Sequence, residues 1–211
     1  EIAQSFGING LKLIKSANYK YTRSQIAMPG FVGGPCLEKD PHILTHNLKS
    51  SKGKDFILNA RKYNESLEDS VVNWIVKVTK KLKTNSFGIT GLAFKGKPDT
   101  SDLRGSSGIN ISRKLKNLGF KLALHDFIVD KDELSNIGEP YSNLYEMTKE
   151  LSLLVILNNN RRYNELDLKK IEAGMKKPKI IFDCWNCIDD KLNNTNLNVL
   201  NLGDLFLDQW E

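Results

Sequence analysis

The hydrophobic pattern of the chain changes near residue 84. Before that point apolar residues recur every three or four positions, as in amphipathic helices, and after it short apolar runs alternate with amphipathic stretches. The second part predicts strands over 86–93, 121–125, 153–157, 179–183 and 198–202, and helices over 106–118, 144–151 and 166–175. Strands that alternate with helices through short links indicate a parallel sheet. We therefore predict an α/β fold, with a helical region over 1–83 followed by a parallel sheet with helices on both faces over 84–211.

The helical region divides into several predicted elements. Residues 1–16 predict the end of one helix and a short second helix, with glycines between them. Residues 55–82 contain neither glycine nor proline and predict one long helix, or two helices joined near Ser66. Between these elements, Pro41 suits the first turn of a further helix.

A glycine-rich stretch precedes that further helix. It reads Met28-Pro29-Gly30-Phe31-Val32-Gly33-Gly34-Pro35-Cys36. Glycine and proline at this density exclude a helix interior or a central strand, so we predict a tight loop that brings backbone amides against a ligand and then presents the Cys36 thiol. Lys39 and a helix start near Cys36 would both favour the reactive thiolate. The spacing alone is equally typical of a glycine-rich turn that leads into a helix with a half-buried cysteine.

Composition limits the classes of function. The chain has 211 residues, of which 40% are hydrophobic, enough for a core and for one or two domains. No apolar run reaches the roughly 18 residues of a membrane span, and the start resembles no signal peptide, so we expect a fragment or a processed chain. Three cysteines suit a reducing cytoplasm. The net charge is +6, but lysines lie along the whole chain beside acidic residues, which favours an anionic small ligand over nucleic acid.

Two pairs of residues have spacings that occur in metal or redox sites. His42 and His46 lie four positions apart, and Cys184 and Cys187 form a Cys-x-x-Cys sequence. Neither pair is accompanied by the acidic residue or the second cysteine pair that such sites require. We therefore predict no metal site.

Two motifs resemble the signatures of the UDP-glucose/GDP-mannose dehydrogenase family. The first is Gly33-Gly34-Pro35-Cys36-Leu37-Glu38-Lys39-Asp40, with Glu38 where many members have proline, and the second comprises Gly91 to Lys95 and Thr100 to Ser106. The resemblance implies that residues 84–211 form a Rossmann-like domain that binds a nucleotide sugar, and that residues 1–83 are part of a central helical region. It also implies that the NAD-binding domain precedes this sequence, with Glu1 ending the helix that connects them.

The resemblance further implies a reaction. The family oxidises the C6 alcohol of a nucleotide sugar to the acid in two NAD-dependent steps, with the cysteine as covalent nucleophile through a thiohemiacetal and a thioester. Here Cys36 is the expected nucleophile, and Asp40 is expected to orient the hydrolytic water. We expect a UDP-sugar as substrate, a homodimer or higher homo-oligomer in the full-length enzyme, and no activity from this chain alone. The alternatives are a non-catalytic module that binds a UDP-sugar or phosphate, and a basic nucleic-acid binder.

The same resemblance implies the contacts of the ligands. Substrate contacts are expected from Arg23 or Lys20, and from Phe31, Gly33, Gly34, Phe94 and Lys95, and cofactor contacts from Lys39 and Arg104. Lys95 and Arg104 would lie at the mouth of the sheet, where they suit phosphate or carboxylate. The alternative for Lys95 is an ion pair with Asp99 or Asp102. Trp185 stands where the family usually has an arginine that contacts the nucleotide sugar, so the resemblance does not supply that contact.

Overall fold

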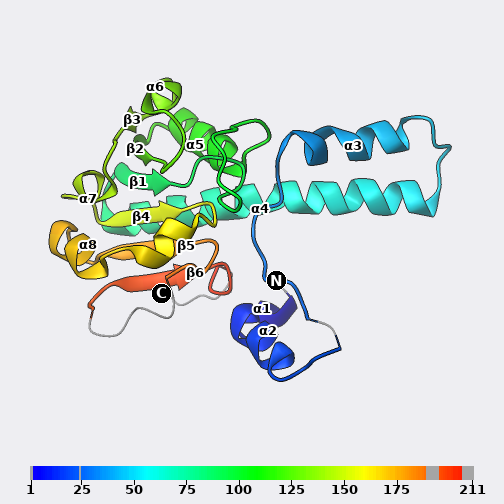
Figure 1. The fold of residues 1–211 in the computed structure, drawn as a ribbon, viewed down its shortest axis with the longest axis horizontal. Coiled ribbons are helices and arrows are strands. Elements are labelled where there is room, and N and C mark those ends of the chain that lie inside the picture. Colours follow the sequence, from blue (N-terminus) through cyan, green and yellow to red (C-terminus); the bar gives the residue numbers. More distant parts are fainter. Residues whose placement is uncertain (1, 24, 189–194, 206–211) are drawn as a thin grey trace.

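The structure is a computed structural model that describes residues 2–23, 25–188 and 195–205 (Figure 1). Its centre is a six-stranded parallel sheet with the order β3-β2-β1-β4-β5-β6, which confirms the predicted α/β fold. The strands are β1 (Ser86–Thr90), β2 (Lys121–His125), β3 (Glu139–Pro140), β4 (Leu153–Ile156), β5 (Ile180–Asp183) and β6 (Asn198–Asn201). The order reverses between β1 and β4, the point at which ligands bind in many open parallel sheets.

Helices cover both faces of the sheet. The helices are α1 (Ile2–Ser5), α2 (Gly10–Asn18), α3 (Pro35–His46), α4 (Lys52–Leu82), α5 (Ser107–Asn117), α6 (Lys131–Leu134), α7 (Leu144–Met147) and α8 (Leu168–Gly174), with a 3-10 turn η1 (Arg161–Glu165). Apolar residues of α4 and α5 form one core with the sheet, and apolar residues of α7 and α8 form a second. Because the strands β1, β2, β4 and β5 are almost entirely buried, their sequences are largely apolar.

The long helix α4 is continuous over 31 residues, which decides between the one-helix and two-helix predictions. Ser51 caps its start by accepting a hydrogen bond from the Lys54 amide at 3.2 Å. Its C-terminal half packs on the sheet, where Trp74 stacks on Phe182 with ring centroids 4.2 Å apart. Its N-terminal half extends beyond the sheet beside α3 (Figure 1). The core of the sheet therefore includes residues of α4 that precede the predicted boundary at residue 83.

Several predicted elements and boundaries differ from the structure. Strand β1 ends at Thr90 rather than residue 93, because Gly91 takes a φ of +85° and turns the chain. Helix α3 begins at Pro35, which agrees with a helix start near Cys36 and not with the start suggested by Pro41. The short elements α6 and β3 were not predicted at all.

Helices α1 and α2 pack against residues 202–204. The Gln4 side chain donates hydrogen bonds to the Leu202 and Gly203 carbonyls at 2.9 and 2.6 Å. Asn9 caps α2 and also donates to the Asp204 carboxylate at 2.6 Å. Glu1 lies outside the described residues. Among the helices that the structure describes, none is long and apolar enough to cross a membrane.

Candidate functional site

Cys36 is the second residue of α3 and is exposed. Pro35 suits the first position of the helix because the amide that it lacks would have no partner there. Pro41 lies inside the same helix and cannot donate a hydrogen bond to the Leu37 carbonyl, yet α3 continues to His46. A helix N-terminus with nearby cations is the environment in which cysteine thiolates are usually activated.

Two glycines before Cys36 pack against the link between β1 and α5. The Gly34 amide donates to the Gly105 carbonyl at 2.9 Å. A Cβ on Gly33 would lie 2.4 Å from the same oxygen, and a Cβ on Gly34 would lie 2.8 Å from the Phe94 ring. Gly34 also has a φ of +103°, which L side chains rarely adopt. The Gly34 amide, which we expected to hold an anion, therefore already donates to a carbonyl of the protein.

The chain just before these glycines is also fixed. Phe31 is 5% exposed and belongs to the main core. Its expected contact with a substrate stays a prediction. The Val32 carbonyl accepts a hydrogen bond from the Asn64 side chain of α4 at 2.8 Å. The backbone of Gly30 lies directly against the indole of Trp185. The segment that leads to Cys36 has no regular secondary structure, yet it is held by both the sheet and α4.

Asp126, which sequence reasoning missed, shapes the link that carries Phe94 and Lys95. Its carboxylate accepts hydrogen bonds from four backbone amides, those of Leu92, Ala93, Ile128 and Val129, at 2.7, 3.1, 2.8 and 3.2 Å. The signal for it was an acidic residue directly after the predicted strand over 121–125. Asp126 thus ties the loop after β1 to the loop after β2.

The Asn-rich turn after β4 supports the same loop from the other side. Asn159 accepts a hydrogen bond from the Gly96 amide at 2.9 Å. A Cβ on Gly96 would lie 2.0 Å from the Asn160 backbone nitrogen, so the two loops are in close contact. The backbone of the Phe94–Lys95 loop is therefore fixed before any ligand binds.

This sheet does not fit an NAD pyrophosphate in the usual manner. In a dinucleotide-binding sheet of this strand order, a short glycine-rich turn after β1 approaches the pyrophosphate and an acid after β2 binds the ribose. Here the acid, Asp126, is fully engaged by backbone amides of the loops that follow β1 and β2. The link from β1 to α5 is long and charged instead of glycine-rich. The residues that the structure describes therefore do not form a dinucleotide site of this kind.

Lys95 carries a charge that no described acidic residue neutralises. Its ammonium lies 5.1 Å from the centroid of the Phe94 ring. Asp99 instead accepts a hydrogen bond from Asn160 at 3.3 Å, and Asp102 binds Arg104. The ion pair that was the alternative for Lys95 is therefore not formed, which leaves this cation free to bind phosphate.

Arg104 and Asp102 form a close pair in the same link. The guanidinium contacts both carboxylate oxygens at 2.8 to 3.2 Å. Hydrogen bonds from the Arg104 side chain, and then from its backbone, lower the pKa of Asp102 to about 2. The pKa of Arg104 is raised mainly by Asp102, and the Cys36 thiolate adds a smaller contribution in the same direction. Arg104 therefore lies within electrostatic range of Cys36.

Lys39 and Asp40 pair with each other on the exposed surface of α3. The hydrogen bond to Asp40 is the main cause of the raised pKa of Lys39, and Cys36 adds a small contribution. Two cations, Lys39 and Arg104, thus lie near the thiol on different elements. The roles of Asp40 toward water and of Lys39 toward a cofactor stay predictions.

The structure does not bring Arg23 to Cys36. Arg23 is exposed and forms no hydrogen bond or ion pair with another described residue. The Lys20 ammonium lies 5.2 Å from the Tyr19 ring. The segment between α2 and α3 runs around α2, away from the sheet and α3, before it turns toward α3 (Figure 1).

The other two cysteines differ from Cys36 in their surroundings. Cys184 is buried, and burial raises the pKa of its thiol. Cys187 is partly buried, and burial, followed by the charge of Asp183, raises its pKa to about 12. All three are free thiols. Within the described part of the chain, no group of three or more His, Cys, Asp and Glu side chains is arranged to hold a metal ion.

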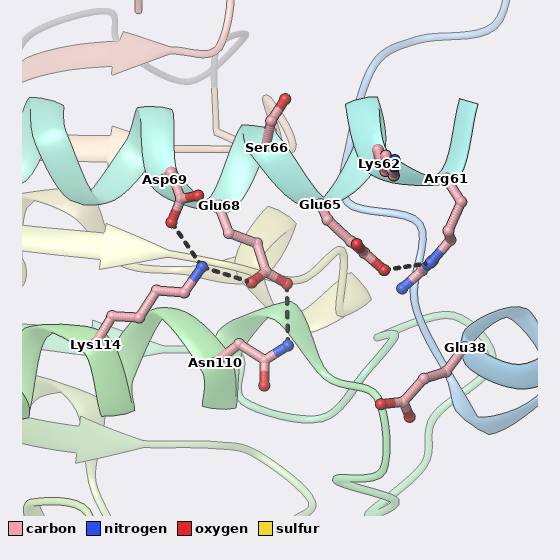
Figure 2. A pocket seen from close by; sticks show the side chains of 9 residues that line it. All are labelled: Glu38, Arg61, Lys62, Glu65, Ser66, Glu68, Asp69, Asn110 and Lys114. Carbon is pink, nitrogen blue, oxygen red and sulfur yellow. Dashed lines mark hydrogen bonds and ion pairs between the residues drawn. The ribbon is translucent and has the colours of Figure 1, made fainter. Parts of the chain in front are cut away.

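A charged groove of about 420 Å³ lies between α3, α4 and α5 (Figure 2). At its base Glu68, which is 7% exposed, accepts hydrogen bonds from Asn110 at 3.1 Å and from Lys114 at 3.3 Å. Lys114 also binds Asp69 at 2.7 Å. These contacts join α4 to α5, and Arg61 pairs with Glu65 at 2.8 Å in the same groove. The groove therefore contains the contacts that connect α4 to α5, and it lies beside α3, the helix of Cys36.

Comparisons with known proteins agree with this architecture. A model of the UDP-binding domain of the UDP-glucose/GDP-mannose dehydrogenase family matches residues 88–190. The UDP-N-acetyl-D-mannosamine dehydrogenase of Methanocaldococcus jannaschii is 32% identical over 208 residues, which are 97% of this chain and 46% of the relative.

Solved structures give the same result. The UDP-N-acetyl-mannosamine dehydrogenase Cap5O of Staphylococcus aureus is 28% identical, with a TM-score of 0.77 over 97% of this chain and 46% of that one. The UDP-D-ManNAc dehydrogenase of Pyrococcus horikoshii is 24% identical, with a TM-score of 0.78 over 98% of this chain and 47% of that one, a likeness of fold. The chain thus spans about half the length of the relatives that it matches.

Proposed function

Since this chain belongs to the UDP-glucose/GDP-mannose dehydrogenase family, we propose that it forms the nucleotide-sugar half of an NAD-dependent 6-dehydrogenase that oxidises a UDP-sugar to the uronic acid. One observation carries the proposal. The helix that carries Cys36 in its first turn is joined, through Gly34 and Gly105, to the link that carries Phe94, Lys95 and Arg104. An exposed thiol and an unneutralised cation thereby belong to one fixed unit at the carboxyl edge of the sheet.

The charges at the site support the first part of the proposal, binding of a UDP-sugar. A UDP-sugar has a pyrophosphate that is negatively charged at neutral pH, and Lys95 is free to pair with it. The Gly33 amide, which makes no hydrogen bond with any described residue, is a further donor for the ligand. Phe94 supplies an apolar surface beside these groups.

The chemical half concerns Cys36. Oxidation of the C6 alcohol gives an aldehyde, and the Cys36 thiolate adds to its carbonyl carbon to give a thiohemiacetal. Removal of a second hydride gives a thioester, and water then displaces the thiolate to release the acid. Both hydrides pass to the nicotinamide cofactor, for which the described sheet offers no dinucleotide site of the usual kind. Asp40, four residues after Cys36 on α3, is the proposed residue that orients the water.

We also propose that the full-length enzyme is a homo-oligomer. Large apolar side chains are exposed on α3 and α4, among them Ile43, Leu44 and Phe56, which are 62 to 75% exposed. Exposed apolar side chains in such number suit an interface. Light scattering on the full-length enzyme would give its mass, and a monomer would contradict this part of the proposal.

Calorimetric titration of this chain with UDP and with GDP tests the binding half. We expect saturable binding of UDP, at least tenfold weaker in Lys95→Ala because a charge-assisted contact to phosphate is lost. Lys97→Ala is the matched control, since Lys97 is an exposed lysine of the same link. Equal affinity in Lys95→Ala and the unsubstituted chain would refute the assigned site, and binding of neither nucleotide would refute the binding function.

A further inference from the structure

Trp185 is fixed at the end of β5 before it meets any other segment. Its indole Nε1 donates a hydrogen bond to the Leu157 carbonyl at 3.0 Å, and its backbone amide donates to the Asp183 carboxylate at 3.0 Å. Asp183 is 1% exposed, and Trp185 is half-buried against the main core. The indole therefore has a defined position relative to the carboxyl ends of β4 and β5.

The six-membered ring of this indole meets the segment that leads to Cys36. A Cβ on Gly30 would lie 2.5, 2.6 and 2.7 Å from three atoms of the six-membered ring of Trp185. These distances are shorter than real side chains allow, so the backbone lies there only because residue 30 is glycine. Phe31, the next residue, enters the core.

The contact with Trp185 is one of two that align the segment. Gly30 is held by the indole, and four residues later the Gly34 amide is held by the Gly105 carbonyl at 2.9 Å. Between them the Val32 carbonyl is bound by Asn64. The position of the start of α3 relative to Arg104 therefore depends on the contact between Trp185 and Gly30.

We propose that Trp185 is a positioning residue for Cys36. By holding Gly30 against the sheet, the indole keeps the start of α3, and with it the thiol, packed on the link that carries Arg104. Without the indole the segment gains freedom, the thiolate loses this cation for part of the time, and its reactivity falls. The inference rests on the proposed role of Cys36, but it concerns the position of the thiol and can be measured without substrate.

A double-substitution cycle tests the contact on the 211-residue chain. The rate of Cys36 alkylation by iodoacetamide at pH 7.5 is measured by mass spectrometry for Trp185→Ala, Gly30→Ala and the double variant. We expect each single variant to react at least threefold more slowly. The double variant should be no slower than the slower single variant, because both substitutions remove the same contact.

Two further variants separate positioning from general loss of stability. Trp185→Phe keeps an aromatic ring beside Gly30 and should react within twofold of the unsubstituted chain. Trp74→Phe, a change of the same type in the core, should lower the melting temperature without changing the alkylation rate, since Trp74 packs on Phe182.

The outcomes that would overturn the inference are definite. One is an unchanged rate of Cys36 alkylation in folded Trp185→Ala. Another is a double variant whose loss of rate is the product of the losses in the two single variants. The third is a loss of rate in Trp74→Phe equal to that in Trp185→Ala. Failure of UDP to bind would refute the proposed function instead, and it would leave these alkylation rates interpretable.

Discussion

His125, at the end of β2, makes the stability of this protein depend on pH. It is 2% exposed, and its Nδ1 lies 2.9 Å from the Thr90 hydroxyl, which in turn lies 2.8 Å from the Tyr163 hydroxyl. Burial lowers the pKa of His125 from 6.5 to about 4, against a smaller opposing effect of Asp126. The folded protein therefore holds this imidazole neutral in a range where the unfolded chain protonates it.

The sign and size of the effect follow from proton linkage. As pH falls below 6.5 the unfolded state binds a proton first, so the stability that the neutral His125 contributes is complete above pH 6.5 and is lost as pH falls toward 4. The difference between the two pKa values corresponds to about 3 kcal/mol in the free energy of unfolding. About 2 kcal/mol of this is lost between about pH 7 and pH 5.

Urea unfolding of the unsubstituted chain and His125→Asn, at about pH 7, 6 and 5, measures this directly. The variant should be the less stable of the two at pH 7, and the difference between them should shrink by about 2 kcal/mol at pH 5. His46→Asn removes an exposed histidine of α3 and is the control for the type of substitution. A difference for His125→Asn that does not change with pH would refute the reasoning.

Three more predictions follow from the site. Iodoacetamide should modify Cys36 faster than Cys184 or Cys187, because one of these is buried and the other has a pKa of about 12; peptide mapping that finds equal rates would contradict this. Glu68→Ala should lower the free energy of unfolding by about 2 kcal/mol, since it removes a buried acceptor of two side chains, and unchanged urea unfolding would contradict it. Asp126→Ala should cost about 2 to 3 kcal/mol and weaken UDP binding at least tenfold, and calorimetry with unchanged affinity would count against its role in shaping the loop.

The central part of the sheet could be predicted from the sequence because β1, β2, β4 and β5 are largely apolar segments bounded by polar turns. The predicted strand over 121–125 has the same bounds as β2. The predicted end of β1 was wrong because Leu92 and Ala93 continue the apolar run. The strand ends earlier because of a tertiary contact: Asp126, which follows β2, accepts hydrogen bonds from the amides of Leu92 and Ala93.

The start of α3 shows a second limit of sequence reasoning. Two prolines, Pro35 and Pro41, compete for the first turn, and local rules accept either one. In the structure the helix begins at Pro35. The Gly34 amide donates to the Gly105 carbonyl, and the chain enters the helix directly after Gly34. That contact joins positions far apart in the sequence, so no local pattern reports it.

The glycines before Cys36 also had two interpretations, and an experiment without ligand distinguishes them. If Gly34 served only to present its amide to an anion, a methyl group there would matter only when the anion binds. In the structure a Cβ on Gly34 meets the Phe94 ring at 2.8 Å, and the φ is +103°. We therefore expect Gly34→Ala to lower the free energy of unfolding of the ligand-free chain by about 2 kcal/mol.

Gly53→Ala is the matched control for this substitution. Gly53 lies in the first turn of α4, where a Cβ would have only one neighbour, at 4.0 Å, so alanine should leave the stability equal or raise it by up to about 1 kcal/mol. If urea unfolding gave Gly34→Ala the same stability as Gly53→Ala, the packing role of Gly34 would be wrong. The two results in the expected order would mean that the glycine loop is shaped first by its contacts with Phe94 and Gly105, and that the ligand meets a surface already formed.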